Sequence, residues 1–221
     1  MRPDIYDAWY HTERGSWIGA TESRLMLELL NASPGASVLD VGSGTGYFSR
    51  RLAAAGRSVV AVDADHAALR FARQRDRQIP CVLGDAQRLP FADRSVDYCT
   101  AVTSLCFVSE PAVALAEMWR VVRCGMFLGL LNRWSLLHHR KRGRGGYRGA
   151  RWDDLAHVRE WAARLDPAPR LVWASGVFVP GASPFARWLE RVIPRGLPWG
   201  AFLAVALHKP DLGRAGPCRG A

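Results

Sequence analysis

Several features are scarce or absent in this chain of 221 residues, and each absence narrows the class of protein. No run of about eighteen apolar residues occurs, so the sequence predicts no membrane-spanning helix. Residues 1–13 lack the apolar core of a secretory signal. The five cysteines are odd in number and form no Cys-x-x-Cys pair, which favours buried free thiols over disulfides or a metal site. These absences predict a cytoplasmic protein.

Lysine is scarce, and acidic residues are missing from one strongly basic stretch of the chain. Arginine outnumbers lysine 28 to 2, and the formal net charge is +10. The segment from Arg133 to Arg151 holds seven Lys/Arg residues and no acid, and without it 23 basic residues face 20 acidic ones. The positive charge is therefore mostly local to this glycine-rich stretch, residues 133–151, which we call the basic segment.

The most informative stretch is a short apolar run that ends in an acid and three alternating glycines. It reads Val38-Leu39-Asp40-Val41-Gly42-Ser43-Gly44-Thr45-Gly46. A helix is expected directly after it, over 47–55. Glycines permit tight turns and a close approach of backbone to ligand, because they carry no Cβ. The N-terminus of the following helix attracts an anion. The stretch therefore predicts a strand, a glycine loop and a helix that hold a ligand against bare backbone.

The spacing of the glycines discriminates between ligands. A dinucleotide site typically has Gly-x-Gly-x-x-Gly, in which the backbone meets a pyrophosphate. Here the order is Asp-x-Gly-x-Gly-x-Gly, with Asp40 two residues before Gly42. An acid at that place would repel a pyrophosphate. It suits a ligand that carries both an ammonium and a carboxylate group.

Strand and helix patterns alternate through the first two thirds of the chain. This alternation predicts βαβ units and a Rossmann-like, doubly wound α/β sheet that is mostly parallel. The expected strands read as continuous apolar runs, as in a sheet covered on both faces. Strands are expected over 37–41, 58–62, 79–83, 95–102 and 126–131, and helices over 47–55, 64–75 and 110–122.

The two ends of the chain are less regular. Residues 1–31 precede the first strand as an N-terminal cap segment, with a helix over 21–30. After the basic segment a helix is expected over 152–165, and a second over 184–193 separates two terminal strands, 170–179 and 199–208. These strands would complete the sheet as an antiparallel pair. We expect residues 1–210 to form a single domain and 211–221 to form a flexible tail.

Acids stand at three successive strand ends: Asp40, Asp63 and Asp85. The carboxyl ends of parallel strands are where ligands bind in an open α/β sheet. Asp63 lies 21 residues after Gly42, where a carboxylate can accept both ribose hydroxyls of a nucleoside. That placement is shared with nicotinamide-binding folds. Asp85 can accept from an adenine amine while the Ala86 amide donates to a ring nitrogen. Each acid alone could equally cap a turn, but three together indicate a cofactor crevice.

The chain resembles the type 11 family of class I S-adenosylmethionine (SAM)-dependent methyltransferases, which includes quinone-biosynthesis enzymes. The resemblance extends from about Tyr6 to Leu165. It implies SAM as cofactor and S-adenosyl-L-homocysteine as product. The matching pieces are Val38 to Gly46, Val60 to Asp63, Gly84 to Phe91, Ser95 to Asp97, and Glu117-Met118-Trp119-Arg120-Val121-Val122-Arg123.

By this resemblance, each part of the cofactor has its own residues. Asp40 helps to place the ammonium, Asp63 the ribose, and Asp85 the adenine. Thr103, just after the fourth strand, lies where the family faces the methyl group. No metal ligand is predicted, and no catalytic residue is assigned. The full predicted cofactor-binding set is Asp40, Gly42, Ser43, Gly44, Gly46, Asp63, Ala64, Asp85, Ala86 and Thr103.

Two departures from the family matter. Many relatives carry a His-His pair after the fourth strand, where this chain has Cys106-Phe107, so that histidine base is missing. Many also read Lys-Pro-Gly-Gly before the fifth strand, where this chain reads Arg123-Cys124-Gly125-Met126. A structural adjustment is expected there. Other groups could act as a base, although a surface or packing role is favoured for each: Tyr10, His11, His138, His139 and Tyr147.

Two segments keep open interpretations. The aromatic stretch Tyr6 to Tyr10 either folds over the cofactor as a lid or packs against the edge of the sheet. The basic segment either binds an acidic or phosphate-bearing substrate, or binds RNA, or contacts an anionic membrane, or is simply solvated. Stacking side chains for the RNA reading are Trp134, Tyr147 and Trp152, and apolar side chains for the membrane reading are Leu136, Leu137, Phe185, Trp188 and Leu189.

The leading functional hypothesis is methyl transfer from SAM to a small-molecule acceptor, anionic or apolar, by in-line displacement at the sulfonium methyl. An RNA methyltransferase is the alternative, although no Asn/Asp-Pro-Pro-Tyr/Phe tetrapeptide is present. A non-catalytic SAM-binding protein is another. A nicotinamide oxidoreductase is a more distant one.

Overall fold

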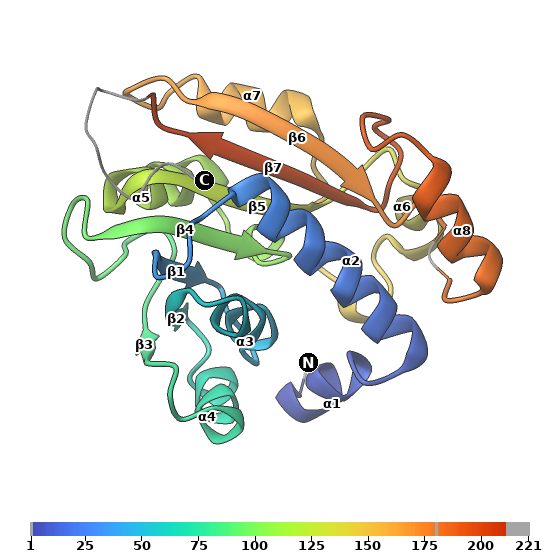
Figure 1. Ribbon diagram of the computed structural model, residues 1–221, viewed down its shortest axis with the longest axis horizontal. Coiled ribbons are helices and arrows are strands. Elements are labelled where there is room, and N and C mark those ends of the chain that lie inside the picture. Colours follow the sequence, from blue (N-terminus) through green and yellow to red (C-terminus); the bar gives the residue numbers. More distant parts are fainter. Residues whose placement is uncertain (1, 180, 211–221) are drawn as a thin grey trace.

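The computed structural model describes residues 2–179 and 181–210. They build one seven-stranded sheet with helices on both faces (Figure 1). The strand order is β3-β2-β1-β4-β5-β7-β6, in which β7 runs antiparallel to both of its neighbours and the other pairs are parallel. The strands are β1 (Ser37–Val41), β2 (Ser58–Asp63), β3 (Cys81–Leu83), β4 (Val96–Val102), β5 (Val122–Leu131), β6 (Arg170–Gly176) and β7 (Phe202–His208). The expected Rossmann-like sheet with an antiparallel C-terminal pair is confirmed.

Two apolar cores lie on the two faces of this sheet. One joins side chains of α2 and α3 to the sheet, and the other joins side chains of α5 and α7 to it (Figure 1). The short helix α1 lies against α4. The helices are α1 (Pro3–Trp9), α2 (Glu13–Leu30), α3 (Tyr47–Ala54), α4 (His66–Arg75), α5 (Pro111–Val121), α6 (Leu136–Lys141), α7 (Leu155–Ala162) and α8 (Pro184–Val192), with the 3₁₀ turns η1 (Leu105–Phe107) and η2 (Gly145–Tyr147).

The structure differs from the sequence predictions mainly outside the βαβ core. The N-terminal segment is almost wholly helical, since α2 begins at Glu13, where the Thr12 hydroxyl caps it by accepting from the Gly15 amide at 3.0 Å. β5 begins at Val122 instead of residue 126. Without the Pro-Gly turn of its relatives, α5 passes directly into the strand. The basic segment is not a plain loop, because it contains α6 and η2.

The cysteine prediction holds in part. Cys81, Cys99 and Cys106 are free thiols, and the last two are buried. The prediction is wrong for Cys124, which is disulfide-bonded. Cys218 and the predicted tail, 211–221, lie outside the described residues. Within the described ranges, no helix combines the length and the apolar character needed to cross a bilayer.

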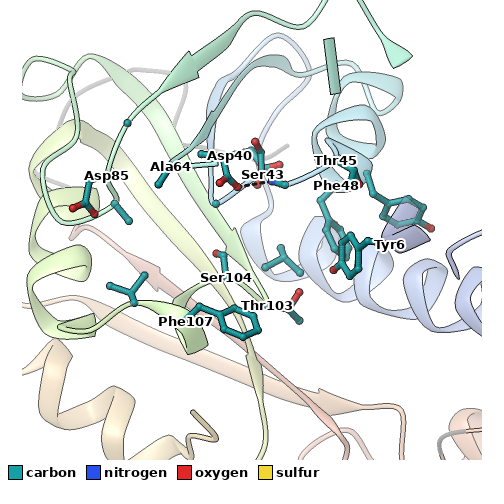
Figure 2. A pocket seen from close by; sticks show the side chains of 18 of the residues that line it. Tyr6, Asp40, Ser43, Thr45, Phe48, Ala64, Asp85, Thr103, Ser104 and Phe107 are labelled. Carbon is teal, nitrogen blue, oxygen red and sulfur yellow. Dashed lines mark hydrogen bonds between the residues drawn. The ribbon is translucent and has the colours of Figure 1, made fainter. Parts of the chain in front are cut away.

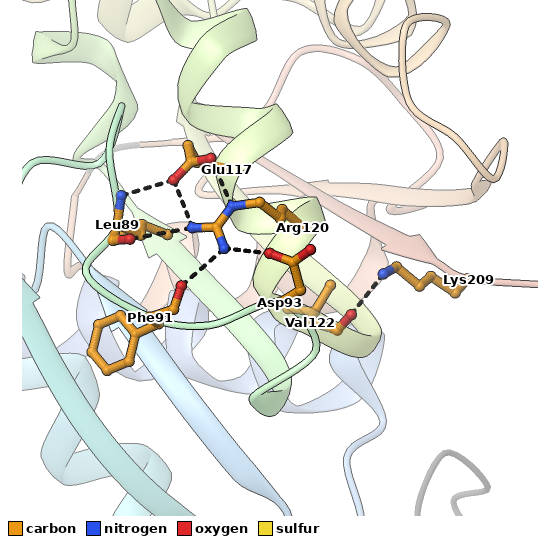
Figure 3. A network of polar contacts seen from close by, with 7 residues as sticks. All are labelled: Leu89, Phe91, Asp93, Glu117, Arg120, Val122 and Lys209. Atoms are coloured by element: carbon orange, nitrogen blue, oxygen red, sulfur yellow. Dashed lines mark hydrogen bonds and ion pairs between the residues drawn. The ribbon is translucent and has the colours of Figure 1, made fainter.

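Arg120 connects α5 to the loop that follows β3 (Figure 3). Its guanidinium donates to Asp93 at 2.6 Å and to the carbonyl oxygens of Phe91 at 2.9 Å and Leu89 at 3.2 Å. It also forms a two-pronged contact with Glu117, 2.8 Å on each side, and this contact lowers the pKa of that carboxyl. Glu117 in turn accepts from the Leu89 amide at 2.9 Å. The family-like stretch of α5 thus fixes the loop that begins at the third strand-end acid.

A second anchor holds the end of the last strand. The ammonium of Lys209 donates to the Val122 carbonyl oxygen at 2.6 Å, as Figure 3 also shows. The same ammonium lies 5.0 Å from the centre of the Trp119 ring. Burial is the main cause that lowers the pKa of Lys209. Residues on either side of Arg120 therefore tie α5 to β7 as well as to the loop.

The Arg120→Ala variant should lower the free energy of unfolding by about 2 kcal/mol, because the Phe91 carbonyl oxygen and Asp93 lose their guanidinium donor and the two-pronged contact with Glu117 is lost. The melting temperature should fall by roughly 4–8 °C in differential scanning calorimetry. Arg88→Ala is the matched control, since Arg88 lies exposed on the same loop. An equal loss in both variants would mean that the network contributes little.

Candidate functional site

A cavity of about 490 Å³ opens at the carboxyl ends of β1, β2, β3 and β4. This volume is within the range of roughly 300–1,000 Å³ that is usual for small-molecule sites. Figure 2 shows Asp85 and Tyr6 on opposite sides of the cavity, with Ser104, Thr103 and Phe107 along one edge. Nine of the ten predicted cofactor-binding residues line the cavity, and Gly46 does not: the nine are Asp40, Gly42, Ser43, Gly44, Asp63, Ala64, Asp85, Ala86 and Thr103.

Each glycine of the loop occupies its position for a different structural reason. Gly42 has φ +70°, and a Cβ there would lie 2.3 Å from the Ser104 Cβ, so no side chain fits. Gly44 has φ +55°, yet nothing lies within 4 Å of its Cβ position. Gly46 precedes α3 with φ +76°, and its Cβ would meet the Ala72 Cβ at 3.2 Å. Gly46 therefore lets the loop approach α4, while Gly44 leaves space on the cavity side.

Asp40 is buried and its two carboxylate oxygens are already engaged. One oxygen accepts from the Ser49 hydroxyl of α3 at 2.6 Å and the other from the Thr100 hydroxyl of β4 at 2.8 Å. Burial raises the pKa of Asp40, although both hydrogen bonds oppose this effect. Asp40 thus joins β1, α3 and β4 below the glycine loop. Its predicted contact with an ammonium group would use the remaining lone pairs.

The other two strand-end acids stabilise turns and still have accepting capacity. Asp63 accepts from the Gly44 amide at 2.7 Å and from the Asp65 amide at 2.8 Å. Asp85 is exposed and accepts from the Gln87 amide at 2.9 Å. An ionised carboxylate offers about four lone-pair sites. Each of these carboxylates can therefore cap a turn and contact a ligand at the same time.

Two buried hydroxyls at the glycine loop have no hydrogen-bond partner among the described residues. They are Ser43 Oγ and Thr45 Oγ1, and both residues line the cavity. Most buried polar side-chain atoms in proteins do have a partner. The loop therefore fits a polar ligand, such as the amino-acid end of SAM, that would complete these bonds.

Thr103 carries backbone strain at the end of β4. Its φ is +51°, a region that β-branched residues rarely adopt, and its amide donates to the Gly129 carbonyl oxygen at 2.7 Å. Such strain costs on the order of 1–3 kcal/mol and clusters at functional sites. The conformation sets Thr103 and Ser104 on the cavity wall.

Aromatic side chains from the N-terminal segment form one wall of the cavity. Tyr10 stacks on Tyr47 with ring centres 3.7 Å apart, and the hydroxyls of Tyr6 and Tyr10 are hydrogen-bonded at 3.0 Å. Phe48 packs edge-on against both Tyr10 and Tyr47. Burial raises the pKa of Tyr6 and of Tyr10. This stretch therefore lies over the cavity and not against the edge of the sheet.

Asp7 holds this wall in place. Its buried carboxylate lies 2.9 Å from the Arg50 guanidinium of α3 and 3.3 Å from the Arg75 guanidinium of α4. His11 lies 3.6 Å from the same carboxylate. One side chain therefore fastens α1 to two helices. That α1 opens and closes as a lid stays a prediction.

Glu22, which the sequence analysis did not single out, is buried beside this aromatic wall. The described residues offer it neither a hydrogen bond nor an ion pair, and its charge acts on Tyr6, Tyr10 and Tyr147. Burial raises the pKa of Glu22 to about 8. The sequence did contain a signal for this burial, because Glu22 stands three residues before Leu25 on the apolar side of α2.

The candidate bases lie away from the centre of the cavity, Tyr10 excepted. No histidine is among the described residues that line it. The His138 and Tyr147 rings pack against Trp152 at 5.1 and 5.4 Å. Cys106, at the place of the family's histidine pair, donates to the Thr103 carbonyl oxygen at 3.2 Å, and burial raises its pKa to about 12. A thiolate nucleophile is therefore not favoured.

Several lining residues were not in the predicted set. More than half of them are aromatic or apolar, and four of these come from α1, α3 and the η1 turn: Tyr6, Tyr47, Phe48 and Phe107. The aromatic Tyr6–Tyr10 stretch signalled a role near the cofactor, and Thr45, Gly84 and Gln87 lie within the family-like stretches. The additional lining residues are Tyr6, Tyr10, Thr45, Tyr47, Phe48, Gly84, Gln87, Val102, Ser104, Phe107, Val108 and Ser109.

Together, the sheet order with its antiparallel β7 and the glycine loop at the end of β1 define the class I methyltransferase fold. Residues 39–128 match the family model of the type 11 methyltransferase domain. The chain therefore contains a SAM-dependent methyltransferase domain of this family.

Individual relatives agree. A demethylmenaquinone methyltransferase from Renibacterium salmoninarum is 45% identical over 102 residues, which cover 46% of this chain and 43% of that protein. A malonyl-[acyl-carrier protein] O-methyltransferase from Serratia marcescens is 38% identical over 100 residues, 45% of this chain and 39% of that protein. The match spans less than half the length of these curated relatives.

The fold extends beyond the matched segment. A SAM-dependent methyltransferase from Thermotoga maritima superposes with a TM-score of 0.75 at 22% identity. This likeness covers 94% of the present chain and 95% of that chain. It shows that the N-terminal helices and the β7-β6 pair belong to the same fold as the glycine loop.

The Glu22→Gln variant should change how stability depends on pH. A raised pKa in the folded state means that wild type loses stability as pH rises towards 8, because ionisation is easier in the unfolded chain. Between pH 5.5 and 8.5, Glu22→Gln should gain about 2–3 kcal/mol relative to wild type, or roughly 5–10 °C in melting temperature.

Glu28→Gln is the control for this measurement. Glu28 lies on the same helix but is half-exposed, and it forms ion pairs with Arg195 at 2.5 Å and Arg24 at 3.6 Å. Its replacement should shift the melting temperature by the same small amount at both pH values. Parallel pH curves for wild type and Glu22→Gln would contradict the burial of an unpartnered carboxyl.

Proposed function

We propose that the protein transfers the methyl group of SAM to a small-molecule acceptor bound in this cavity. The observation that carries the proposal is a pair of hydroxyls, Ser43 and Thr45, which find no partner in the described part of the chain and lie on a glycine loop beside strand-end carboxylates. The methyltransferase domain that residues 39–128 match supports the choice of cofactor.

In this proposal the glycine loop receives the methionyl end of the cofactor. Asp40, Gly42, Ser43 and Gly44 face that end, while Gly46 shapes the loop from behind. The ribose lies with Asp63 and Ala64. The adenine lies with Asp85 and Ala86. When bound, SAM supplies a methyl group that its positively charged sulfur already activates.

The work of the chain's own residues is then positioning and the exclusion of water. Alignment of reacting groups can lower a barrier by roughly 7–11 kcal/mol. Thr103, held by its strained backbone, faces the reacting side of the cavity. Tyr6, Phe48 and Phe107 give the remaining walls an apolar character. Glu22 and the Tyr6–Tyr10 hydroxyl pair are the buried groups nearest to this wall that could hold a proton.

The apolar walls favour an acceptor with an apolar portion. The relatives named above act on demethylmenaquinone and on malonyl-[acyl-carrier protein], so these two are the first acceptors to test. We further propose that residues 1–210 act as one domain in which 1–31 cap the cavity. A cytoplasmic location stays a prediction from the sequence, as does the lower-ranked alternative of a nucleic-acid acceptor.

Gly44→Ala should weaken SAM binding by about tenfold or more in isothermal titration calorimetry. The alanine side chain would fill the open space beside the loop in which the cofactor is proposed to lie. Gly35→Ala is the matched control. Gly35 also has positive φ (+82°) and open space at its Cβ, but it does not line the cavity. Both variants should lose about 1 kcal/mol of stability, and only the first should lose affinity.

Methyl-labelled SAM then tests turnover. Label should pass to a demethylquinone or a malonyl thioester with wild type and with Gly35→Ala, and much more slowly with Gly44→Ala. Label in RNA would replace the proposed acceptor class. Tight SAM binding without transfer to any acceptor in a host lysate would indicate a non-catalytic binder.

A further inference from the structure

Helix α8 has an unusual distribution of side chains. Surface helices normally bury their apolar side and expose their polar side. Here Phe185, Trp188 and Val192, spaced three and four residues apart, are 63%, 55% and 52% exposed. The buried side instead holds Glu190, which accepts from the Val177 and Phe178 amides at 2.9 and 3.1 Å. The outward face of this helix is therefore apolar and aromatic.

Further exposed tryptophans lie in the segments around α8. Trp199, in the loop after α8, and Trp134, just before α6, are each 59% exposed. The two segments are joined because the Asn132 amide donates to the Pro198 and Gly200 carbonyl oxygens at 2.7 and 2.8 Å. We call Trp134, Phe185, Trp188, Val192 and Trp199 the aromatic surface.

Unpaired cations follow Trp134 within the basic segment, beginning at Arg140. Two arginines of the basic segment are neutralised, Arg151 by Asp153 at 2.8 Å and Arg133 by Asp154 at 3.6 Å. The other cations are exposed and form no ion pair within the described part of the chain. They are Arg140, Lys141, Arg142, Arg144 and Arg148.

These features share one end of the sheet with the cavity. Leu131 of β5 and Gly176 of β6 both pair with Phe202 of β7, so the segments that follow β5 and β6 emerge at the same end. This is also the end at which β4 leads into the cavity wall, since Val102 pairs with Gly129. A body that docks on the aromatic surface would therefore lie at the cavity end of the molecule.

We propose that the aromatic surface and the basic segment together dock this protein on an anionic lipid membrane. Tryptophan and phenylalanine side chains favour the boundary between headgroups and acyl chains, and an amphipathic helix lies in that plane. Clusters of four to eight Lys/Arg are attracted by the negative surface potential of such a membrane. The inference does not depend on methyl transfer.

Other occupants fit less well. A second copy of the chain would bring the same five unpaired cations towards one another, and like charges at an interface oppose association. Single-stranded nucleic acid needs aromatic platforms within the basic groove. On α8, by contrast, Phe185, Trp188 and Val192 form an apolar face, and the five unpaired cations of the basic segment lie outside this helix. A continuous apolar face with a separate cationic segment matches a bilayer surface best.

The test is sedimentation with vesicles. Wild type should bind vesicles of phosphatidylcholine mixed with phosphatidylglycerol, should bind phosphatidylcholine alone much more weakly, and should be released by salt. The double variant Phe185→Ala/Trp188→Ala should bind the anionic vesicles with an affinity at least about tenfold lower than that of wild type. The triple variant Arg140→Gln/Lys141→Gln/Arg142→Gln should lose about tenfold to a hundredfold.

Matched controls use surfaces elsewhere. Arg70→Gln/Arg73→Gln/Arg77→Gln removes the same charge from exposed arginines in and just after α4, and Val113→Ala trims an exposed apolar side chain of α5. Both should bind vesicles like wild type. Melting temperatures verify that every variant folds.

Three results would overturn the proposal. One is the absence of binding to anionic vesicles by folded wild type. Another is an equal loss of vesicle binding in the α4 control, which would mean that binding depends on the total charge of the protein and not on this surface. The third is a dimer, seen in sedimentation velocity, that Phe185→Ala/Trp188→Ala abolishes while vesicle binding is unchanged. That result would assign the aromatic surface to a second copy.

Discussion

The buried carboxylate of Asp40 is the interaction on which the candidate site depends. It accepts one hydroxyl from α3 and one from β4, so three elements meet at the point where the glycine loop begins. Burying a charge is costly unless it is hydrogen-bonded, and these two bonds offset that cost. The loop can then turn through three left-handed glycines, and Asp63 secures its middle by accepting from the Gly44 amide. The cavity is therefore shaped from below by polar bonds and closed from above by aromatic packing.

Much of this arrangement follows from local sequence signals. β1 was predicted with the boundaries it has, because a short apolar run ends in an acid and a glycine. The acids at the ends of β2 and β3 follow the same logic, since parallel strands bring their carboxyl ends together. Gly46 shows the limit of the motif. Its spacing marks it as part of the loop, but its contact with Ala72 of α4 is a tertiary fact that no local pattern contains.

The parts that the sequence left open or missed depend on contacts between distant segments. Tyr6 and Tyr10 reach the cavity only because Asp7 pairs with arginines of α3 and α4, more than forty residues away in the chain. Glu22 is buried because the aromatic wall covers it, and nothing in α2 alone indicates that it lacks a partner. The outward aromatic face of α8 has a helical period that sequence can detect. Whether that face points to the core or to solvent is decided by Glu190 and the backbone it binds.

The double pairing of Asp7 has a consequence for the timing of events at the cavity. Releasing either Arg50 or Arg75 alone would leave a buried carboxylate only partly compensated, which is strongly unfavourable. The two contacts are therefore expected to break together, so that α1 detaches as one unit and does not fray residue by residue. If α1 does open, this double ion pair would act as a latch with a closed and an open position, and breaking it would form the barrier between them. The residence time of whatever lies beneath Tyr6 and Tyr10 would then be set by the opening rate of this latch, independently of how tightly the loop below holds its ligand.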